Sequence, residues 1–115
     1  MPTERDIETA ILQHLAGVSP GQDPTLCYNQ LAARMGVSNN LRGTKRQLDS
    51  ISARYGRPSA DITWILKKVG TDYPSQIDGK DVRKRSSLTP TDKAKARAGL
   101  RRVIRRFCPG ASNPY

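Results

Sequence analysis

The sequence has few of the side chains that build metal sites, disulfide frameworks or membrane spans. Its 115 residues include 2 cysteines, which lie 81 positions apart, and 1 histidine. These are too few for a disulfide lattice or a zinc-ligand cluster. No apolar run approaches the roughly 20 residues that a bilayer span requires, and residues 1–4 lead directly into polar sequence, unlike a signal peptide. The sequence therefore predicts a small soluble domain in the cytoplasm, with no membrane partner.

Aromatic side chains are also few: 1 tryptophan, 4 tyrosines and 1 phenylalanine. Recognition of single-stranded RNA depends on aromatic side chains that stack on the bases. No stacking motif surrounds the aromatic residues of this chain, so RNA is the least favoured nucleic acid. A chain of this length has room for one hydrophobic core, and we expect one compact domain.

Acidic side chains are scarce relative to basic ones, with 10 Asp and Glu against 20 Lys and Arg and a net charge of +10. Residues 1–78 carry 9 basic and 8 acidic side chains, whereas residues 79–115 carry 11 and 2. This asymmetry is typical of a near-neutral folded body with a cationic appendage. Such a charge block associates with polyanions, because binding releases condensed counterions from phosphates. A solubilising face and an acidic protein partner are compatible with the same charge.

Helix caps and breakers predict the first half of the fold. Thr3 begins a capping box with an acidic residue three positions later, and the apolar spacing that follows predicts a helix over 4–16. Residues 18–24 form a loop, and residues 25–28 form a short strand or begin the next helix. That helix covers 29–35 and ends at Gly36.

A longer helix is expected next, capped by Ser38, Asn39 or Asn40 and running to Tyr55. Gly43 lies inside it and costs about 1 kcal/mol relative to alanine. This glycine indicates either a close approach of another group or a helix that begins later. Residues 61–69 are the clearest strand, and 73–77 return as an irregular edge strand.

The last third begins with an exposed basic connector. Thr89 and Pro90 then predict an N-cap and first position for a helix over 90–107. Its apolar stripe packs on the body or on a second copy of the chain. A loose terminus is expected over 111–115.

The segment Tyr28 to Ser38, with the sequence YNQLAARMGVS, resembles the first helix and turn of a winged helix-turn-helix DNA-binding domain. Small residues there let two helices cross closely, and the glycine permits a sharp turn. The resemblance covers 25–77. It implies a helix-turn-helix and wing core over 1–78. The residues beyond it add a basic connector over 79–88 and a basic amphipathic C-terminal helix and tail over 89–115, so the expected fold is α+β and mainly helical.

The resemblance also implies that the helix beginning near Ser38 enters the major groove of a duplex. Nucleic-acid contacts then fall on Asn39, Asn40, Arg42, Lys45 and Arg46, and at the tip of the wing on Lys67 and Lys68. The positive charge of the connector and of the C-terminal helix predicts that both segments also bind phosphates. Their candidate residues are Arg83, Lys84, Arg85, Lys93, Arg97, Arg101, Arg102 and Arg105.

Catalytic chemistry finds little support. His14 lies on the apolar side of its helix, which favours a partly buried structural role. Asp61, together with the Asp78-Gly79-Lys80 segment, loosely resembles the acid–acid–lysine arrangement of metal-dependent nucleases, but an Asp-Gly turn explains the second acid better. Cys27 and Cys108 have no metal-ligand spacing. We therefore expect no enzyme activity, no metal and no cofactor.

The sequence thus predicts a non-enzymatic nucleic-acid-binding protein, a small bacterial or phage regulator of transcription that binds double-stranded DNA. A second hypothesis is a small phage-type interaction or inhibitor protein that binds or blocks a nucleic-acid-handling complex, such as a host defence system. A protein partner or a homodimer is compatible with either hypothesis.

Overall fold

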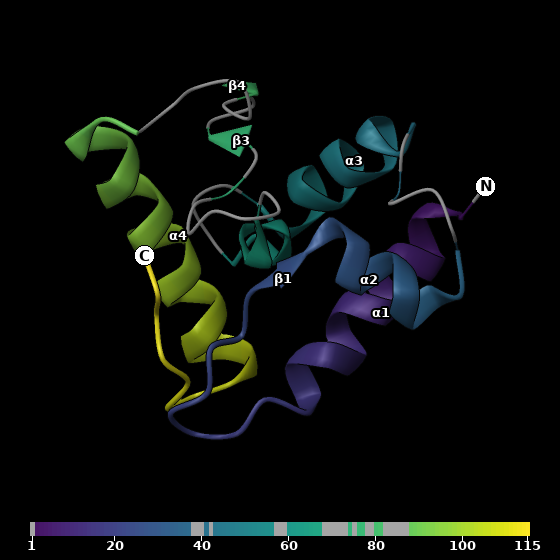
Figure 1. Ribbon diagram of the computed structural model, residues 1–115. Helices are drawn as coiled ribbons and strands as arrows, with labels where there is room; N and C mark the ends of the chain where they lie inside the picture. The colour runs from purple at the N-terminus through teal and green to yellow at the C-terminus, as the bar shows by residue number, and fades with distance from the viewer. Residues whose placement is uncertain are drawn as a thin grey trace.

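Helices dominate the computed structural model, which describes residues 2–37, 41, 43–56, 60–67, 74, 76–77, 80–81 and 88–115 (Figure 1). The described part of the chain is α+β and mainly helical. In order, its elements are α1 (Glu4–Ala16), β1 (Leu26–Cys27), α2 (Tyr28–Met35), α3 (Lys45–Tyr55), the 3₁₀-helix η1 (Ile62–Ile65), β2 (Leu66–Lys67), β3 (Gln76–Ile77), β4 (Lys80–Asp81) and α4 (Pro90–Phe107). None of these helices is both long and apolar enough to cross a bilayer.

The first two helices agree with the sequence analysis. The Thr3 hydroxyl accepts from the backbone N–H of Asp6, and the Asp6 carboxylate accepts from the backbone N–H of Thr3, each at 3.1 Å. The capping box is therefore confirmed. Residues 25–28 supply both alternatives that the sequence left open, because β1 passes directly into α2. Gly36 ends α2 in the left-handed region with φ 72°, where glycine carries no steric penalty.

The third helix begins later than the sequence predicted. It starts at Lys45, so the expected helix from Ser38 to Tyr55 is wrong in its first part. Leu41 has φ 61° and Gly43 has φ 78°, and neither conformation fits a right-handed helix. The Leu41 side chain is only 4% exposed, so its burial in the core sets the backbone in a turn. The three proposed caps at 38–40 lie outside the described residues.

The predicted strand over 61–69 is wrong at its start. Ile62–Ile65 form the 3₁₀-helix η1, and Leu66–Lys67 are the residues of this range that form a strand in the described part of the chain. The buried Asp61 carboxylate accepts from the backbone N–H of Thr63 at 2.9 Å and from its hydroxyl at 2.6 Å. These local hydrogen bonds compete with a strand ladder. Ile62 and Ile65, three positions apart, both point into the core.

The described residues form two small sheets, one that joins distant segments and one that is a local hairpin. β1 pairs in parallel with β2, with Leu26 opposite Leu66. Pro74 forms an isolated antiparallel bridge with Lys67, and β3 pairs antiparallel with β4. The expected return over 73–77 is therefore confirmed at Gln76–Ile77, whereas β4 lies in the segment expected to be a plain connector.

α4 closes the core from one side of the molecule (Figure 1). Its N-cap Thr89 accepts from the backbone N–H of Asp92 at 3.1 Å, and its bounds match the sequence prediction. Ala96, Gly99 and Leu100 are among its buried residues. A Cβ added at Gly99 would lie 2.3 Å from Cε2 of Trp64, so the indole packs directly on the helix backbone. The Cα radius of gyration of 13.0 Å fits one compact domain.

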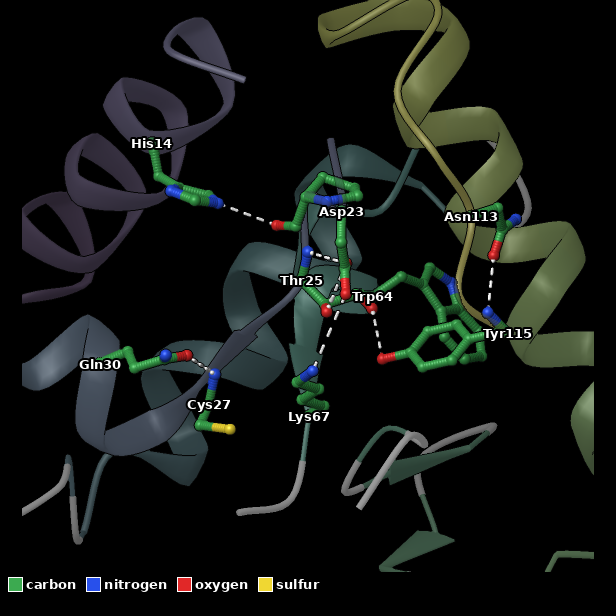
Figure 2. Close-up of polar contacts among 10 residues, drawn as sticks. His14, Asp23, Thr25, Cys27, Gln30, Trp64, Lys67, Asn113 and Tyr115 are labelled. Atoms are coloured by element: carbon green, nitrogen blue, oxygen red, sulfur yellow. Dashed lines mark hydrogen bonds and ion pairs between the residues drawn. The ribbon is translucent and has the colours of Figure 1, made fainter. Parts of the chain in front are cut away.

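The expected loose terminus over 111–115 is wrong. Ser112 donates its backbone N–H to the Gln22 carbonyl at 2.8 Å, and the Asn113 amide donates to the Arg97 carbonyl at 2.9 Å. The Tyr115 hydroxyl donates to the Trp64 carbonyl at 3.4 Å (Figure 2). The tail therefore folds back along α4 and helps to hold it on the body.

Candidate nucleic-acid interface

The outward side of α4 carries the densest charge of the described chain. Seven basic residues and one acid lie in its 18 residues. We call the seven the α4 basic face: Lys93, Lys95, Arg97, Arg101, Arg102, Arg105 and Arg106. All seven are exposed, because the buried stripe of α4 faces η1 and the core. Helical spacing thus separates the basic and apolar sides as the sequence predicted.

Most charges of the α4 basic face have no counter-ion among the residues that the structure describes. Within the described residues, five members form no ion pair: Lys93, Arg97, Arg101, Arg102 and Arg105. Arg106 lies over the ring of Phe107, with its guanidinium carbon 5.1 Å from the centroid. A contact with an aromatic ring leaves the positive charge in place. The face is therefore a concentrated source of positive potential.

The cations of α3 are arranged differently. Lys45 Nζ lies 2.9 Å from Asp49 Oδ2, one turn along the same helix. Arg54 reaches across to α1, where its guanidinium is 2.7 Å from carboxylate oxygens of both Glu4 and Glu8. Only Arg46 is exposed and without an ion pair among the three basic residues of this fully described helix. The helix that the resemblance assigns to the major groove thus presents little unneutralised charge.

The contact between α1 and α3 also shifts proton affinities. Hydrogen bonds from Arg54 and then from Tyr55 hold the pKa of Glu8 below its usual value. Burial, followed by the hydrogen bond to Glu8 at 2.5 Å, raises the pKa of Tyr55 to about 12. At neutral pH Glu8 is therefore ionised and Tyr55 is protonated, and their hydrogen bond helps to hold α3 on α1. The role of both residues is structural.

Lys67 does not lie at an exposed tip. It is part of β2, its side chain is 18% exposed, and its Nζ lies 3.9 Å from Asp23 Oδ2 (Figure 2). The same carboxylate group accepts from the backbone N–H of Thr25 at 2.8 Å. Lys67 therefore joins β2 to the loop before β1. The other predicted contact residues lie outside the described part of the chain: Asn39, Asn40, Arg42, Lys68, Arg83, Lys84 and Arg85.

The residues considered for catalysis have structural partners. His14 is half-buried, and its Nε2–H donates to the Pro24 carbonyl at 2.9 Å (Figure 2). Burial lowers the pKa of His14, so the ring is neutral at pH 7. Asp61 caps η1 and also accepts from the hydroxyl of Ser52. The residues that the structure describes contain no group of three or more side chains that could hold a metal.

The sequence analysis did not predict the contact between Gly99 of α4 and Trp64 of η1. Gly99 lies in the buried stripe, and only a residue without a Cβ leaves room for Trp64. A glycine in the middle of a helix costs about 1 kcal/mol relative to alanine, so its presence signals a close approach of another group. The tail contact of Asn113 with the Arg97 carbonyl had no local signal in the sequence.

Comparisons with protein-family models, with curated proteins and with solved structures each return no match. The function of this chain therefore has to be argued from the chemistry and geometry of its own residues.

Proposed function

We propose that this protein binds nucleic acid without catalysing a reaction on it, and that the α4 basic face is its main phosphate-binding surface. The observation that carries the proposal is a helix with seven cations and one acid, five of the cations exposed and without a counter-ion among the described residues. Phosphates of nucleic acid provide the matching charge, and release of their counterions supplies the driving force.

The cost of this arrangement in the unbound protein supports the proposal. Arg97, Arg101 and Arg105 follow one another at intervals of four residues, so neighbouring guanidinium groups repel. Each such pair of like charges destabilises a helix by roughly 0.2–0.5 kcal/mol. A polyanion converts this repulsion into favourable contacts.

Duplex DNA is the form of nucleic acid that we propose, and a winged helix-turn-helix centre over 25–77 is part of the proposal. Two observations support that centre. Gly36 ends α2 in the left-handed conformation, and Ala32 of the same helix is 1% exposed in the core. In this arrangement the protein acts as a small DNA-binding regulator. The connection from Gly36 to Thr44 is longer than the three- or four-residue turn that joins the helices in simple versions of the motif.

A salt-titrated binding experiment tests this function. The protein is mixed with a duplex of random sequence, with single-stranded DNA and with RNA, and the affinity is measured from low to high salt. If the five cations without counter-ions each neutralise one phosphate, the plot of log K against log salt has a slope near roughly −4.5 on duplex DNA. We expect the duplex to bind more tightly than RNA.

Two results would contradict the proposal. One is a slope shallower than about −2 on duplex DNA, because so weak a dependence leaves most of the cations without phosphate contacts. The other is that this protein shows no affinity for duplex DNA and instead forms a stoichiometric complex with an acidic protein, and that this complex survives nuclease treatment. That outcome would assign the α4 basic face to a protein partner.

A further inference from the structure

The α4 basic face has an internal pattern that bears on how it meets its ligand. Its exposed cations do not cover the helix uniformly. Lys93, Arg97 and Arg101 follow one another at intervals of four residues and form one row. The second row lies across the outward surface and consists of Lys95, Arg102 and Arg106, at intervals of seven and four. Because residues three and four apart are neighbours on a helix, these rows flank a strip between them.

The strip between the rows is narrow and smooth. Its N-terminal half is formed by Ala94, which is exposed, and by Ala98, which is half-buried between its neighbours. Arg105 closes the strip at its C-terminal end. The helix backbone is therefore closest to the surface along Ala94 and Ala98, and long cationic side chains extend on both sides.

Double-stranded DNA offers the complementary shape. Its major groove is about 12 Å wide and is bordered by a phosphate backbone on each side. An α-helix with its side chains is about 10–12 Å across, so it fits this groove. Two cation rows then reach the two borders, while small side chains between them allow the helix to approach the base edges. Alanine also contacts the methyl group of thymine there.

The outward side of α4 is accessible for such an approach. Its buried side packs on η1, and most of the helix lies at the edge of the molecule (Figure 1). Its C-terminal end meets the end of α3, where the ring centroids of Phe107 and Tyr55 are 6.2 Å apart. The folded-back tail contacts α4 through Asn113, which donates to the Arg97 carbonyl, and contacts η1 through Tyr115, yet the two rows stay exposed. In α3, by contrast, Ala53 lies exposed near Arg54, whose charge is held by two glutamates of α1.

We propose that α4, and not α3, is the helix that enters the major groove of duplex DNA, with Ala94 at the point of closest approach and one cation row on each phosphate backbone. This inference rests on the proposed function and adds the docking element to it. It assigns to α3 at most a lateral contact through Arg46.

A bulky, uncharged side chain at the point of closest approach tests the inference. Ala94→Trp leaves every charge in place and prevents the helix from reaching the groove floor. We expect its affinity for a 20-base-pair duplex to fall at least about ten-fold, because the phosphate contacts of both rows lengthen together. Its affinity for a single strand, which has no groove, should stay within about two-fold of the parent protein. The matched control is Ala53→Trp, the same change at an exposed alanine of α3, and it should leave both affinities unchanged.

Protection of guanine N7 from methylation by dimethyl sulfate gives a second measurement on the parent protein, independent of any variant. A helix in the major groove shields N7 in the bound duplex, and we expect that protection. Unchanged duplex affinity in Ala94→Trp, a loss in Ala53→Trp instead, or unprotected N7 would each overturn the inference. Failure of the parent protein to bind duplex DNA would overturn the proposed function as well, so the two failures are distinguishable.

Discussion

α3 and α4 are both amphipathic helices with cations on the outward side, yet they use those cations differently. In α3, Lys45 is paired with Asp49, and Arg54 is paired with two glutamates of α1. In α4, five of seven basic residues have no counter-ion among the described residues. A cation that stabilises the fold is already neutralised. Of these two helices, the comparison therefore points to α4 as the one whose charge is available to an external anion.

The difference follows from where the acidic residues lie. Arg54 and its partner Glu4 are 50 positions apart in the chain and meet only through the packing of α1 on α3. The last third of the sequence has two acids for eleven basic residues, so α4 has few local counter-ions. Counting charges along the sequence locates the excess, whereas the fold decides which cations remain available.

The largest expected effect comes from disrupting the packing of the Trp64 indole on α4. Gly99→Ala places a Cβ 2.3 Å from the Trp64 indole, so the helix and the ring must move apart. Overpacking of this kind costs about 1–3 kcal/mol, which lowers Tm by roughly 4 °C per kcal/mol in a domain of about 100 residues. Thermal unfolding measures the loss, and the emission of the single tryptophan reports the movement of the ring.

A double variant isolates the cause. In a Trp64→Ala background, Gly99→Ala should cost far less than in the parent protein, because the clash is gone and alanine favours the helix. If Gly99→Ala lowers the free energy of unfolding equally in both backgrounds, the contact with Trp64 does not explain the effect of this substitution.

A smaller loss is expected at the N-terminus of α4. Thr89→Ala removes the hydroxyl that accepts from the backbone N–H of Asp92, and loss of such a cap costs about 1 kcal/mol. Thr89→Ser keeps the acceptor and should keep the stability. α3 has no side-chain cap of this kind, so the two helices differ at their N-termini too. Equal Tm values for Thr89→Ala and Thr89→Ser would show that the cap contributes nothing.

Acidification should separate stability from binding. Burial lowers the pKa of His14 below its usual value near 6.5. Below about pH 6.5 the unfolded chain therefore binds a proton that the folded chain does not, and stability falls with falling pH. We expect a lower Tm at pH 5.5 than at pH 7.5, with a smaller difference in His14→Gln. Lys and Arg of α4 do not titrate in this range, so duplex affinity should stay nearly constant from pH 6 to 8; a steep change would place a titrating group at the interface.

The smallest effect is expected from freeing a cation on α3. Asp49→Asn removes the partner of Lys45 and makes the outward side of α3 more positive. If duplex DNA lies along α4 and makes no contact with α3, salt screens the freed charge of Lys45, and the affinity of the protein for the duplex should rise less than about two-fold. A rise of five-fold or more in a binding titration would place α3 in contact with the DNA and weaken the contrast between the two helices.

The sequence predicted the parts of the fold that local chemistry determines. Thr3, Gly36 and Thr89 act on their own helix ends, and the corresponding boundaries are confirmed. Gly43 indicated that α3 could begin later, which the structure confirms, but its exact start could not be predicted, because it depends on the burial of Leu41 in a core built from distant segments. η1 was missed because the apolar run after Asp61 fits either structure, and the Asp61 cap decides between them. The exposure of the basic residues on α4 followed from helical spacing, whereas the pairing of Arg54 depended on tertiary contacts.

The most direct test of the account compares two triple variants with the same change in net charge. One is Arg97→Ala, Arg101→Ala and Arg105→Ala on α4; the other is Arg5→Ala, Arg34→Ala and Arg46→Ala, three exposed arginines elsewhere on the molecule. The measurement is the salt dependence of affinity for duplex DNA. The account predicts that the α4 variant loses roughly 2.7 units of the slope of log K against log salt, while the other keeps the slope within about one unit. Equal losses in the two variants, or a larger loss in the second, would contradict it.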